Sequence, residues 1–123
     1  MSDSNVVTAS ADSTVRLFET FSGTQLTVYR GHESAVLCVS IFGDLIVSGG
    51  FDGKLVFYNL KGMTLHTMRF NAPVSDLRIS PNGGFCCLFL LGEGVVLLKI
   101  DLNNLKNCKQ VFKWAVSEGK FLH

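Results

Sequence analysis

Short apolar segments separated by turn sequences run through most of the chain. Four of them are rich in β-branched and aromatic residues and cover residues 36–41, 45–48, 55–58 and 65–69. Asp52-Gly53 separates the second segment from the third. An Asp-Gly pair between two apolar runs is a strong hairpin signal, because glycine adopts a positive φ that other residues avoid. The pattern therefore predicts short antiparallel strands joined by tight turns.

The same organisation continues towards the C-terminus. Residues 80–84, Ser-Pro-Asn-Gly-Gly, separate an apolar segment at 74–79 from another at 85–91. No segment shows sustained helical periodicity over ten or more residues. Segments such as 36–39 and 86–91 are apolar at consecutive positions, which is typical of sheets covered on both faces. We expect an all-β chain whose sheets pack against one another.

The strand pattern repeats along the chain. Residues 8–19 align with residues 48–59, so that Asp12 and Asp52 occupy equivalent turn positions. A weaker third copy places Glu93 at the corresponding turn of the next unit. The spacing of these acidic residues matches the period of roughly 40–45 residues that four short strands per blade give a β-propeller. We therefore predict a partial β-propeller of about three four-stranded antiparallel blades.

The predicted blades divide the chain into four stretches. They are a partial blade of three strands at residues 1–30, a complete blade at 31–70, a degenerate blade at 71–114, and the start of a further strand or a tail at 115–123. The chain begins in mid-repeat, since residues 6–8 match the second strand of a blade. Because a propeller closes with about four to eight blades, we expect further blades from a longer chain or from another copy to complete the ring.

Composition and charge limit the classes of partner. The chain is 47% hydrophobic and 17% charged, so it can bury a core. Its net charge is +1 and no run of basic residues exceeds two, so we expect no direct contact with nucleic acid. The longest apolar run, residues 85–98, is interrupted by Gly92-Glu93-Gly94 and is shorter than the ~18 residues that a membrane span needs. We therefore expect no membrane-spanning segment.

The four cysteines are Cys38, Cys86, Cys87 and Cys108. Cys86 and Cys87 would point to opposite faces of a strand, so they cannot readily form a disulfide with each other. The sequence has no Cys-x-x-Cys pair and its three histidines are scattered, so we predict neither a metal site nor a bound cofactor. We expect buried thiols in a reducing compartment, the cytoplasm or the nucleus.

The unit at residues 31–59 resembles one repeat of the WD-repeat family. It contains, in order, Gly31-His32, an apolar strand, Leu45-Ile46-Val47-Ser48-Gly49, the turn Asp52-Gly53, and Tyr58-Asn59 where the family has Trp-Asp. The preceding unit has Phe18-Glu19 at that last place. The resemblance extends from Val6 to about Lys113 and implies the β-propeller fold.

The resemblance also implies a buried hydrogen-bonded network in the complete unit. Its members would be His32, Ser48, Asp52 and Tyr58. The Asp52 carboxylate can accept from backbone N–H groups and from the imidazole, and His32 can reach the Ser48 hydroxyl. The hydroxyl of Tyr58 would replace the indole donor of the family.

The two neighbouring units match this network only in part. In the first unit Thr8 and Asp12 occupy the serine and aspartate positions, but the aromatic position has no hydrogen-bond donor. In the third unit the histidine and serine positions carry other side chains, Phe70 or Asn71 and Cys87 or Leu88. We expect apolar packing alone to hold the third unit together.

Members of the family usually bind partners through the narrow face of the propeller. This face is formed by the loop before the innermost strand and by the turn before the network aspartate. The resemblance places there Glu33, Ser34, Phe51, Asn71, Ala72 and Pro73. Phe51 is a large aromatic residue in a polar turn, so it either packs on a neighbour or anchors a partner. Trp114, near the end of the last predicted strand, allows the same two interpretations.

The sequence therefore predicts a non-catalytic scaffold that binds a protein or peptide partner through loops between strands. A structural segment of a longer propeller, with its binding surface elsewhere, is an alternative. A small hydrolase using Ser48, His32 and Asp52 is a second alternative. It lacks the Gly-x-Ser-x-Gly nucleophile elbow, because Ile46 occupies the position of the first glycine, while Gly50 matches the second.

Overall fold

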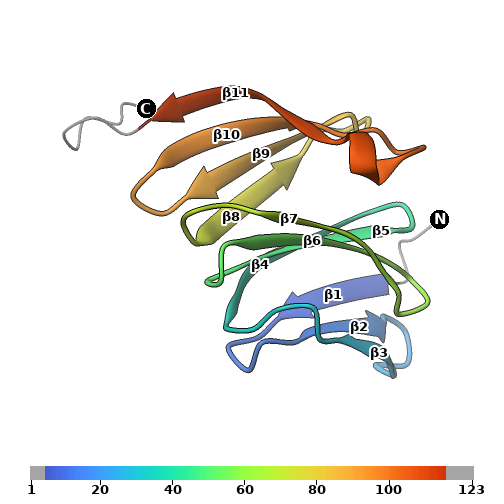
Figure 1. Ribbon diagram of the computed structural model, residues 1–123. Helices are drawn as coiled ribbons and strands as arrows, with labels where there is room; N and C mark the ends of the chain where they lie inside the picture. Colours follow the sequence, from blue (N-terminus) through green and yellow to red (C-terminus); the bar gives the residue numbers. More distant parts are fainter. Residues whose placement is uncertain (1–4, 116–123) are drawn as a thin grey trace.

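The computed structural model describes residues 5–115 and folds them into three antiparallel sheets (Figure 1). The first sheet has the order β1-β2-β3, with β1 (Asn5–Ala9), β2 (Val15–Glu19) and β3 (Gln25–Tyr29). The second sheet has the order β4-β5-β6-β7, with β4 (Val36–Phe42), β5 (Leu45–Gly50), β6 (Lys54–Asn59) and β7 (Thr64–Arg69). The third sheet has the order β8-β9-β10-β11, with β8 (Val74–Ile79), β9 (Phe85–Leu90), β10 (Gly94–Lys99) and β11 (Lys109–Ala115). The predicted all-β class is confirmed.

Two details differ from the sequence-based expectations. Ala115, expected to begin a further strand, is the last residue of β11 and pairs with Gly94. The remainder of that stretch, residues 116–123, lies outside the described residues. The connection between β10 and β11 contains a single-turn 3-10 helix, η2 (Leu105–Asn107). No helix in the described part of the chain is long and apolar enough to cross a membrane.

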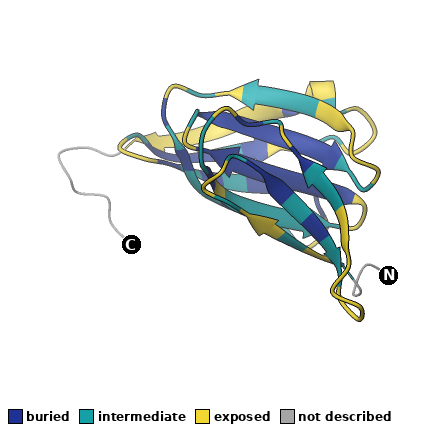
Figure 2. Ribbon diagram, turned by 90° about the horizontal axis from the view of Figure 1, so that it is seen from below, coloured by how far each residue is buried: buried dark blue, intermediate teal, exposed yellow. Residues whose placement is uncertain are grey.

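The three sheets lie one against the next, with the second sheet in the middle (Figure 1). β4 contacts β1 of the first sheet, and β8 of the third sheet packs against β4 and β5. The middle sheet is consequently covered on both faces. Every residue of β5 and all but the last residue of β6 are buried, whereas the turns at the ends of the strands are mostly exposed (Figure 2). This double burial explains why these strands are apolar at consecutive positions.

A core fills each of the two interfaces between sheets. The core between the first and second sheets includes Val15, Leu17, Tyr29, Ile46, Val56 and Tyr58. The rings of Tyr29 and Tyr58 are 4.6 Å apart, and the Tyr29 hydroxyl donates to the Asn59 carbonyl at 2.8 Å. The core between the second and third sheets includes Val47, Leu55, Phe57, Leu77, Leu88 and Val96. Burial of apolar area at these two interfaces is what holds the sheets against one another.

The strand register shows which residues are equivalent in the three sheets. The pairs are Ala9 with Val15 in the first sheet, Gly49 with Leu55 in the second, and Phe89 with Val95 in the third. The same place in successive sheets is therefore held by Ala9, Gly49 and Phe89. These three residues are spaced by one period of the sequence repeat. Residues that are one sequence period apart thus occupy equivalent positions in the strand pairing of successive sheets.

The first two hairpin turns follow the same repeat. Gly53 has a φ of +80°, and a Cβ there would lie 2.6 Å from the carbonyl oxygen of Phe70. This turn consequently requires glycine for its conformation and for the close approach of the next loop. Ser13 holds the equivalent position in the first sheet and has a φ of 76° without being glycine.

Candidate functional site

A buried hydrogen-bond network joins two strands of the second sheet, the turn between them and the loop before β4. His32 comes from the loop before β4, Ser48 from β5 and Tyr58 from β6. The Nε2 atom of His32 lies 2.7 Å from the Ser48 hydroxyl, which is 3.2 Å from the Tyr58 hydroxyl. The Nδ1 atom of His32 lies 3.1 Å from a carboxylate oxygen of Asp52 in the β5–β6 turn. The structure brings these four residues together.

The carboxylate of Asp52 is held by backbone as well as side-chain donors. It accepts from the backbone N–H of Glu33 at 2.7 Å and of Lys54 at 3.1 Å. Burial opposes ionisation of Asp52, but these N–H groups and the His32 side chain together lower its pKa below the ordinary value. The network therefore ties the loop before β4 to the β5–β6 hairpin through an ionised aspartate.

Ser48, His32 and Asp52 are hydrogen-bonded in the same sequence as the members of a catalytic triad. The serine and the histidine, however, are buried inside the protein. Ser48 is 0% exposed and His32 is 5% exposed. A nucleophile must reach the reacting carbon of a substrate, and the Ser48 hydroxyl has no surface on which one could bind. Its second hydrogen bond, to Tyr58, also directs it into the core. The network therefore links the loop before β4, β5, β6 and the β5–β6 turn in a closed interior.

In the first sheet the expected pair is not joined. Thr8 is exposed on β1, opposite Arg16, and its hydroxyl makes no hydrogen bond within residues 5–115. Asp12 instead accepts from the backbone N–H of Thr14 at 3.1 Å and from the side chain of Arg16 at 3.3 Å. Asp12 therefore stabilises its own turn, whereas Asp52 links its turn to another loop.

In the third sheet, leucines stand where the second sheet has the polar network. Leu88 pairs with Val96 as Ser48 pairs with Val56, and Leu98 takes the place of Tyr58 by pairing with Cys86. Both leucines are 0% exposed and belong to the core. Apolar packing thus occupies the interior positions that hydrogen bonds occupy in the second sheet.

Phe51 belongs to the β5–β6 turn. The β1–β2, β5–β6 and β9–β10 turns lie along the same edge of the molecule (Figure 1). We call this edge the narrow face. The side chain of Phe51 is 58% exposed, and its backbone N–H donates to the carbonyl of Ala35 at 2.9 Å. Phe51 borders a shallow hollow of about 250 Å³ together with Asn71 and Pro73. Phe51, Asn71 and Pro73, three of the residues expected at a binding face, are therefore neighbours, and Ala72 also lines the hollow.

The other three residues expected at this face differ in what they present. The Glu33 carboxylate is 75% exposed and lies 3.6 Å from the Lys54 ammonium. The Ser34 hydroxyl oxygen is buried and has no hydrogen-bond partner among the described residues. Ala72 is 8% exposed and belongs to the core between the second and third sheets. Ala72 consequently offers little side-chain surface to a partner, although it lines the hollow beside Phe51.

Leu91 is a residue of this face that sequence reasoning missed. It follows β9 as Phe51 follows β5, is 58% exposed, and donates its N–H to the Pro73 carbonyl at 2.9 Å. The signal that could have revealed it is its place one period of the repeat after Phe51. The third turn, Gly92-Glu93-Gly94, hides this equivalence because the aspartate of the earlier turns is absent.

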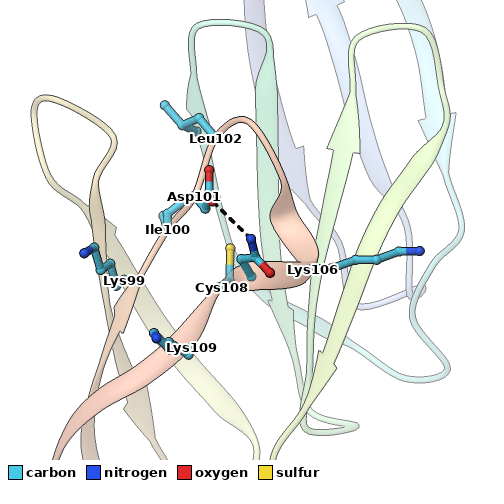
Figure 3. A pocket seen from close by; sticks show the side chains of 8 residues that line it. Lys99, Ile100, Asp101, Leu102, Lys106, Cys108 and Lys109 are labelled. Atoms are coloured by element: carbon cyan, nitrogen blue, oxygen red, sulfur yellow. Dashed lines mark hydrogen bonds between the residues drawn. The ribbon is translucent and has the colours of Figure 1, made fainter.

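A larger hollow of about 800 Å³ lies at the opposite end of the third sheet (Figure 3). Its lining includes Lys99 at the end of β10 and Lys109 at the start of β11. Within its wall the side chain of Asn107 donates to the Asp101 carboxylate at 3.4 Å. Sequence reasoning missed this site, for which the only signal is a loose cluster of lysines that also includes Lys106. No group of three potential metal ligands gathers here or elsewhere in residues 5–115.

The four cysteines are free thiols in the structure. Cys38 lies on β4 and Cys86 on β9, in the interface between the second and third sheets. Burial raises the pKa of each of these two thiols to about 12. Burial also raises the pKa of Cys87 and of Cys108. Neutral buried thiols behave as small apolar side chains.

Comparison with known proteins places these features in a family. The family model described as "WD domain, G-beta repeat" matches residues 23–59. The ribosome biogenesis protein bop1 of Danio rerio is 29% identical over 121 residues, 81% of this chain and 16% of that protein. The periodic tryptophan protein 2 homolog of Caenorhabditis elegans is 32% identical over 79 residues, 64% of this chain and 8% of that protein. The polyadenylation factor subunit 2 of Schizosaccharomyces pombe is 38% identical over 58 residues, 45% of this chain and 11% of that protein.

Solved structures show the same fold. The β-propeller domain of Myceliophteria thermophila Cps50 (Swd1) superposes with a TM-score of 0.79 at 19% identity, over 93% of this chain and 36% of that one. The computationally designed Ika8 protein gives a TM-score of 0.71 at 22% identity, over 80% of this chain and 31% of that one. The chain thus spans a minor part of each protein that it matches. Residues 23–59 thus match a WD repeat, and the recurring strand register and stacked sheets of the described residues show the β-propeller fold.

Proposed function

We propose that this chain is a non-catalytic interaction scaffold whose narrow face binds a protein or peptide partner. The observation that carries the proposal is the exposed side chain of Phe51 beside the hollow that Asn71 and Pro73 complete. Large aromatic anchors that bind next to small pockets contribute much of the energy of protein interfaces. Leu91, equally exposed in the equivalent turn, extends the same apolar surface.

The rigid frame beneath Phe51 supports this proposal. The backbone of Phe51 is hydrogen-bonded to Ala35, and the next residue, Asp52, is fixed by His32 and by backbone N–H groups. A side chain presented from such a turn loses little conformational entropy when it binds. Burial of the Ser48 hydroxyl argues against the hydrolase alternative. In this proposal the partner binds to the exposed side chain of Phe51, whose turn is held in place by the buried network.

The place in the cell forms part of the same proposal. The names of two relatives refer to ribosome biogenesis and to polyadenylation, and free thiols persist in reducing compartments. We therefore propose the nucleus ahead of the cytoplasm as the site of action. Fractionation of cells that express the tagged chain tests this directly, and a purely cytoplasmic chain would refute it.

The binding test compares two exposed phenylalanines. Phe51→Ala removes the anchor of the narrow face, whereas Phe21→Ala, in the β2–β3 turn, removes a phenylalanine that is 90% exposed. Affinity capture from nuclear extract, quantified by mass spectrometry, should show partners lost with Phe51→Ala and retained with Phe21→Ala. An identical partner set for both variants and the unchanged chain would remove the case for the narrow face.

A structural segment with its binding surface elsewhere is the second candidate function. It is favoured by the number of sheets, since the described residues form three and a ring needs about four to eight blades. In that case neither phenylalanine variant should change the captured partners. Joining the chain to further blades of a longer protein should then be required for any specific capture.

A further inference from the structure

The connection between β10 and β11 differs from its counterparts in the other two sheets. Those counterparts are short turns, residues 20–24 between β2 and β3 and residues 60–63 between β6 and β7. The β10–β11 connection extends over residues 100–108 and contains η2, which contacts β7 of the second sheet. It therefore reaches from the third sheet to the second, and loops that are longer than a compact turn often carry function.

Hydrogen bonds within this connection hold it in one conformation. The Asp101 carboxylate accepts from the backbone N–H groups of Asn103 at 3.0 Å and of Asn104 at 3.3 Å. The side chain of Asn104 in turn accepts from the backbone N–H of Lys106 and so caps η2. Leu105 packs against the core between the second and third sheets. The connection is consequently a fixed wall, and the charge of Asp101 is engaged by donors of its own loop.

An apolar groove of about 340 Å³ lies between this wall and the second sheet, and we call it the inter-sheet groove. Leu102 and Leu105 line it from the connection, and Phe42 and Leu45 line it from the second sheet. The ring of Phe42 packs so closely on Gly83 of the β8–β9 turn that a Cβ there would clash with it. Leu102 is 49% exposed. The groove is thus open to solvent between walls that are already held in place.

A β-bulge adds Leu65 to the inter-sheet groove. The pairing of β6 with β7 skips Leu65, which is therefore the extra residue of the bulge. Bulges change the direction of a side chain, and Leu65 is 42% exposed and lines the groove. Leu26 is the extra residue at the equivalent bulge of the first sheet and is 50% exposed. The two leucines match in their place within the repeat, but only Leu65 belongs to the lining of this groove.

The inter-sheet groove does not depend on where the sequence ends. Both of its walls come from the second and third sheets, which already pack against each other. A further sheet would instead cover the free side of the first or of the third sheet. The groove is also distinct from the narrow face, because Leu45 begins β5 and Phe51 follows its last residue. The two surfaces therefore lie at opposite ends of that strand.

A single charged side chain lies in the lining of the groove. It is the carboxylate of Asp44 in the β4–β5 turn, which forms no ion pair within residues 5–115. The basic residues of the neighbouring turns, Lys61 and Lys106, are not part of the lining. Figure 3 shows the side chain of Lys106 extending away from Leu102. An apolar groove with one free carboxylate is complementary to an apolar side chain next to a cation.

We propose that the inter-sheet groove binds a segment of a partner protein in which a large apolar side chain precedes basic residues. The apolar side chain fills the groove between Leu65 and Leu102, and an adjacent cationic group contacts the Asp44 carboxylate. Because the walls are fixed before binding, little conformational entropy is lost. The proposal uses a different surface from Phe51, so it does not rest on the function proposed above.

Amide chemical shifts of the full chain provide the test, because Gly43 and Leu102 belong to the lining. The isotope-labelled chain is titrated with a synthetic peptide that carries one phenylalanine followed by a pair of lysines. We expect saturable shifts at these two amides and none at the amide of Phe51. A peptide with alanine in place of the phenylalanine should bind at least about tenfold more weakly. A peptide with glutamates in place of the lysines should bind about fivefold more weakly.

Two leucine variants locate the apolar contact. Leu65→Ser should raise the dissociation constant of the lysine peptide about tenfold, whereas Leu26→Ser at the equivalent bulge should leave it unchanged. Leu102→Ser, which lies outside the strands, should have the same effect as Leu65→Ser and tests the opposite wall. Circular dichroism of the variants shows whether they fold alike.

A further pair of variants locates the charge contact. Asp44→Asn should raise the dissociation constant about threefold and reduce its salt dependence. Glu33→Gln removes a carboxylate that is 75% exposed at the narrow face, and it should change neither quantity. Phe51→Ala should also keep the affinity, which separates the groove from the narrow face.

Each of four results would overturn the proposal. The shifts at Gly43 and Leu102 could fail to saturate, or Leu65→Ser and Leu102→Ser could both keep full affinity. Equal or tighter binding of the glutamate peptide would show that Asp44 does not select the partner. A dimer in sedimentation, with shifts at the same amides that depend on chain concentration without peptide, would assign the groove to a second copy of the chain.

Discussion

The Nε2 atom of His32 lies 2.7 Å from the hydroxyl of Ser48, and both side chains are buried between the first and second sheets. This contact is the centre of a network that also includes Asp52 and Tyr58. Because buried polar groups are costly when they lack partners, each member depends on the others. The third sheet avoids this dependence by placing leucines at the equivalent positions.

Removing the Ser48 hydroxyl tests how much the network stabilises the chain. Ser48→Ala leaves His32 Nε2 and the Tyr58 hydroxyl without their buried partner, so the free energy of unfolding should fall by about 1–3 kcal/mol. Urea denaturation followed by circular dichroism measures this change. Thr8→Ala, at the equivalent but exposed position of the first sheet, should change stability by no more than about 0.5 kcal/mol. Equal effects of the two substitutions would contradict the role of the network.

The ionised state of Asp52 predicts a dependence on pH. Because its pKa is lower in the folded chain than its ordinary value, its contribution to stability is full above that value, which is about 3.9. The contribution is lost as the pH falls towards the folded pKa. Asp52→Asn keeps the shape but cannot ionise. The stability difference between the two proteins should be largest near neutral pH and should shrink below about pH 4.

Urea denaturation of both proteins at several pH values measures this dependence. Asp44→Asn, in the β4–β5 turn, is a matched exposed control. A difference between the Asp52 proteins that stays constant from neutral to acidic pH would show that the charge of Asp52 contributes nothing.

The close approach of β8 to Gly49 predicts a strong effect of a single methyl group. In Gly49→Ala the new Cβ would lie 2.5 Å from Val74, so the second and third sheets must separate, at a cost of about 1–3 kcal/mol. In a Val74→Ala background the same substitution should cost less, because the nearest clashing methyl group is gone, while the Cys38 thiol at 2.7 Å still opposes the new Cβ. A double-mutant cycle by urea denaturation yields the coupling. Strict additivity would show that the two residues do not touch.

The thiols predict an order of chemical reactivity. Burial raises the pKa of Cys38 and of Cys86 to about 12, and the thiolate is the reactive form. Iodoacetamide at mildly alkaline pH should therefore leave both residues unmodified in the native chain and should label all four cysteines in urea. Peptide mapping by mass spectrometry identifies the labelled positions. Rapid native labelling of Cys86 would mean that the second and third sheets do not pack as described.

The fold was largely predictable from the sequence because its determinants are local. The backbone preferences of Asp52-Gly53 favour a hairpin turn without help from distant residues. The strand pairing recurs with the same period as the sequence repeat. The consecutive apolar positions of β5 reflect burial on both faces, which needs no knowledge of the neighbouring sheet.

The site was less predictable because it depends on neighbours in space. Thr8 matches Ser48 in sequence, yet no histidine among residues 5–115 bonds to Thr8, and its side chain is exposed. Ala72 is adjacent to the exposed Asn71, yet it is directed into the core. Phe89 looks like an ordinary strand residue until the register places it where Gly49 lies in the preceding sheet. Such differences between equivalent positions become visible only when the sheets are aligned.

The stacking of the third sheet on the second is tested most directly by one nuclear Overhauser measurement in the full chain. We expect a strong cross-peak between the α-protons of Gly49 and the methyl groups of Val74, because nothing larger than hydrogen fits between these residues. If the amide spectrum shows a folded chain and this cross-peak is absent, the sheets do not stack as blades of a propeller.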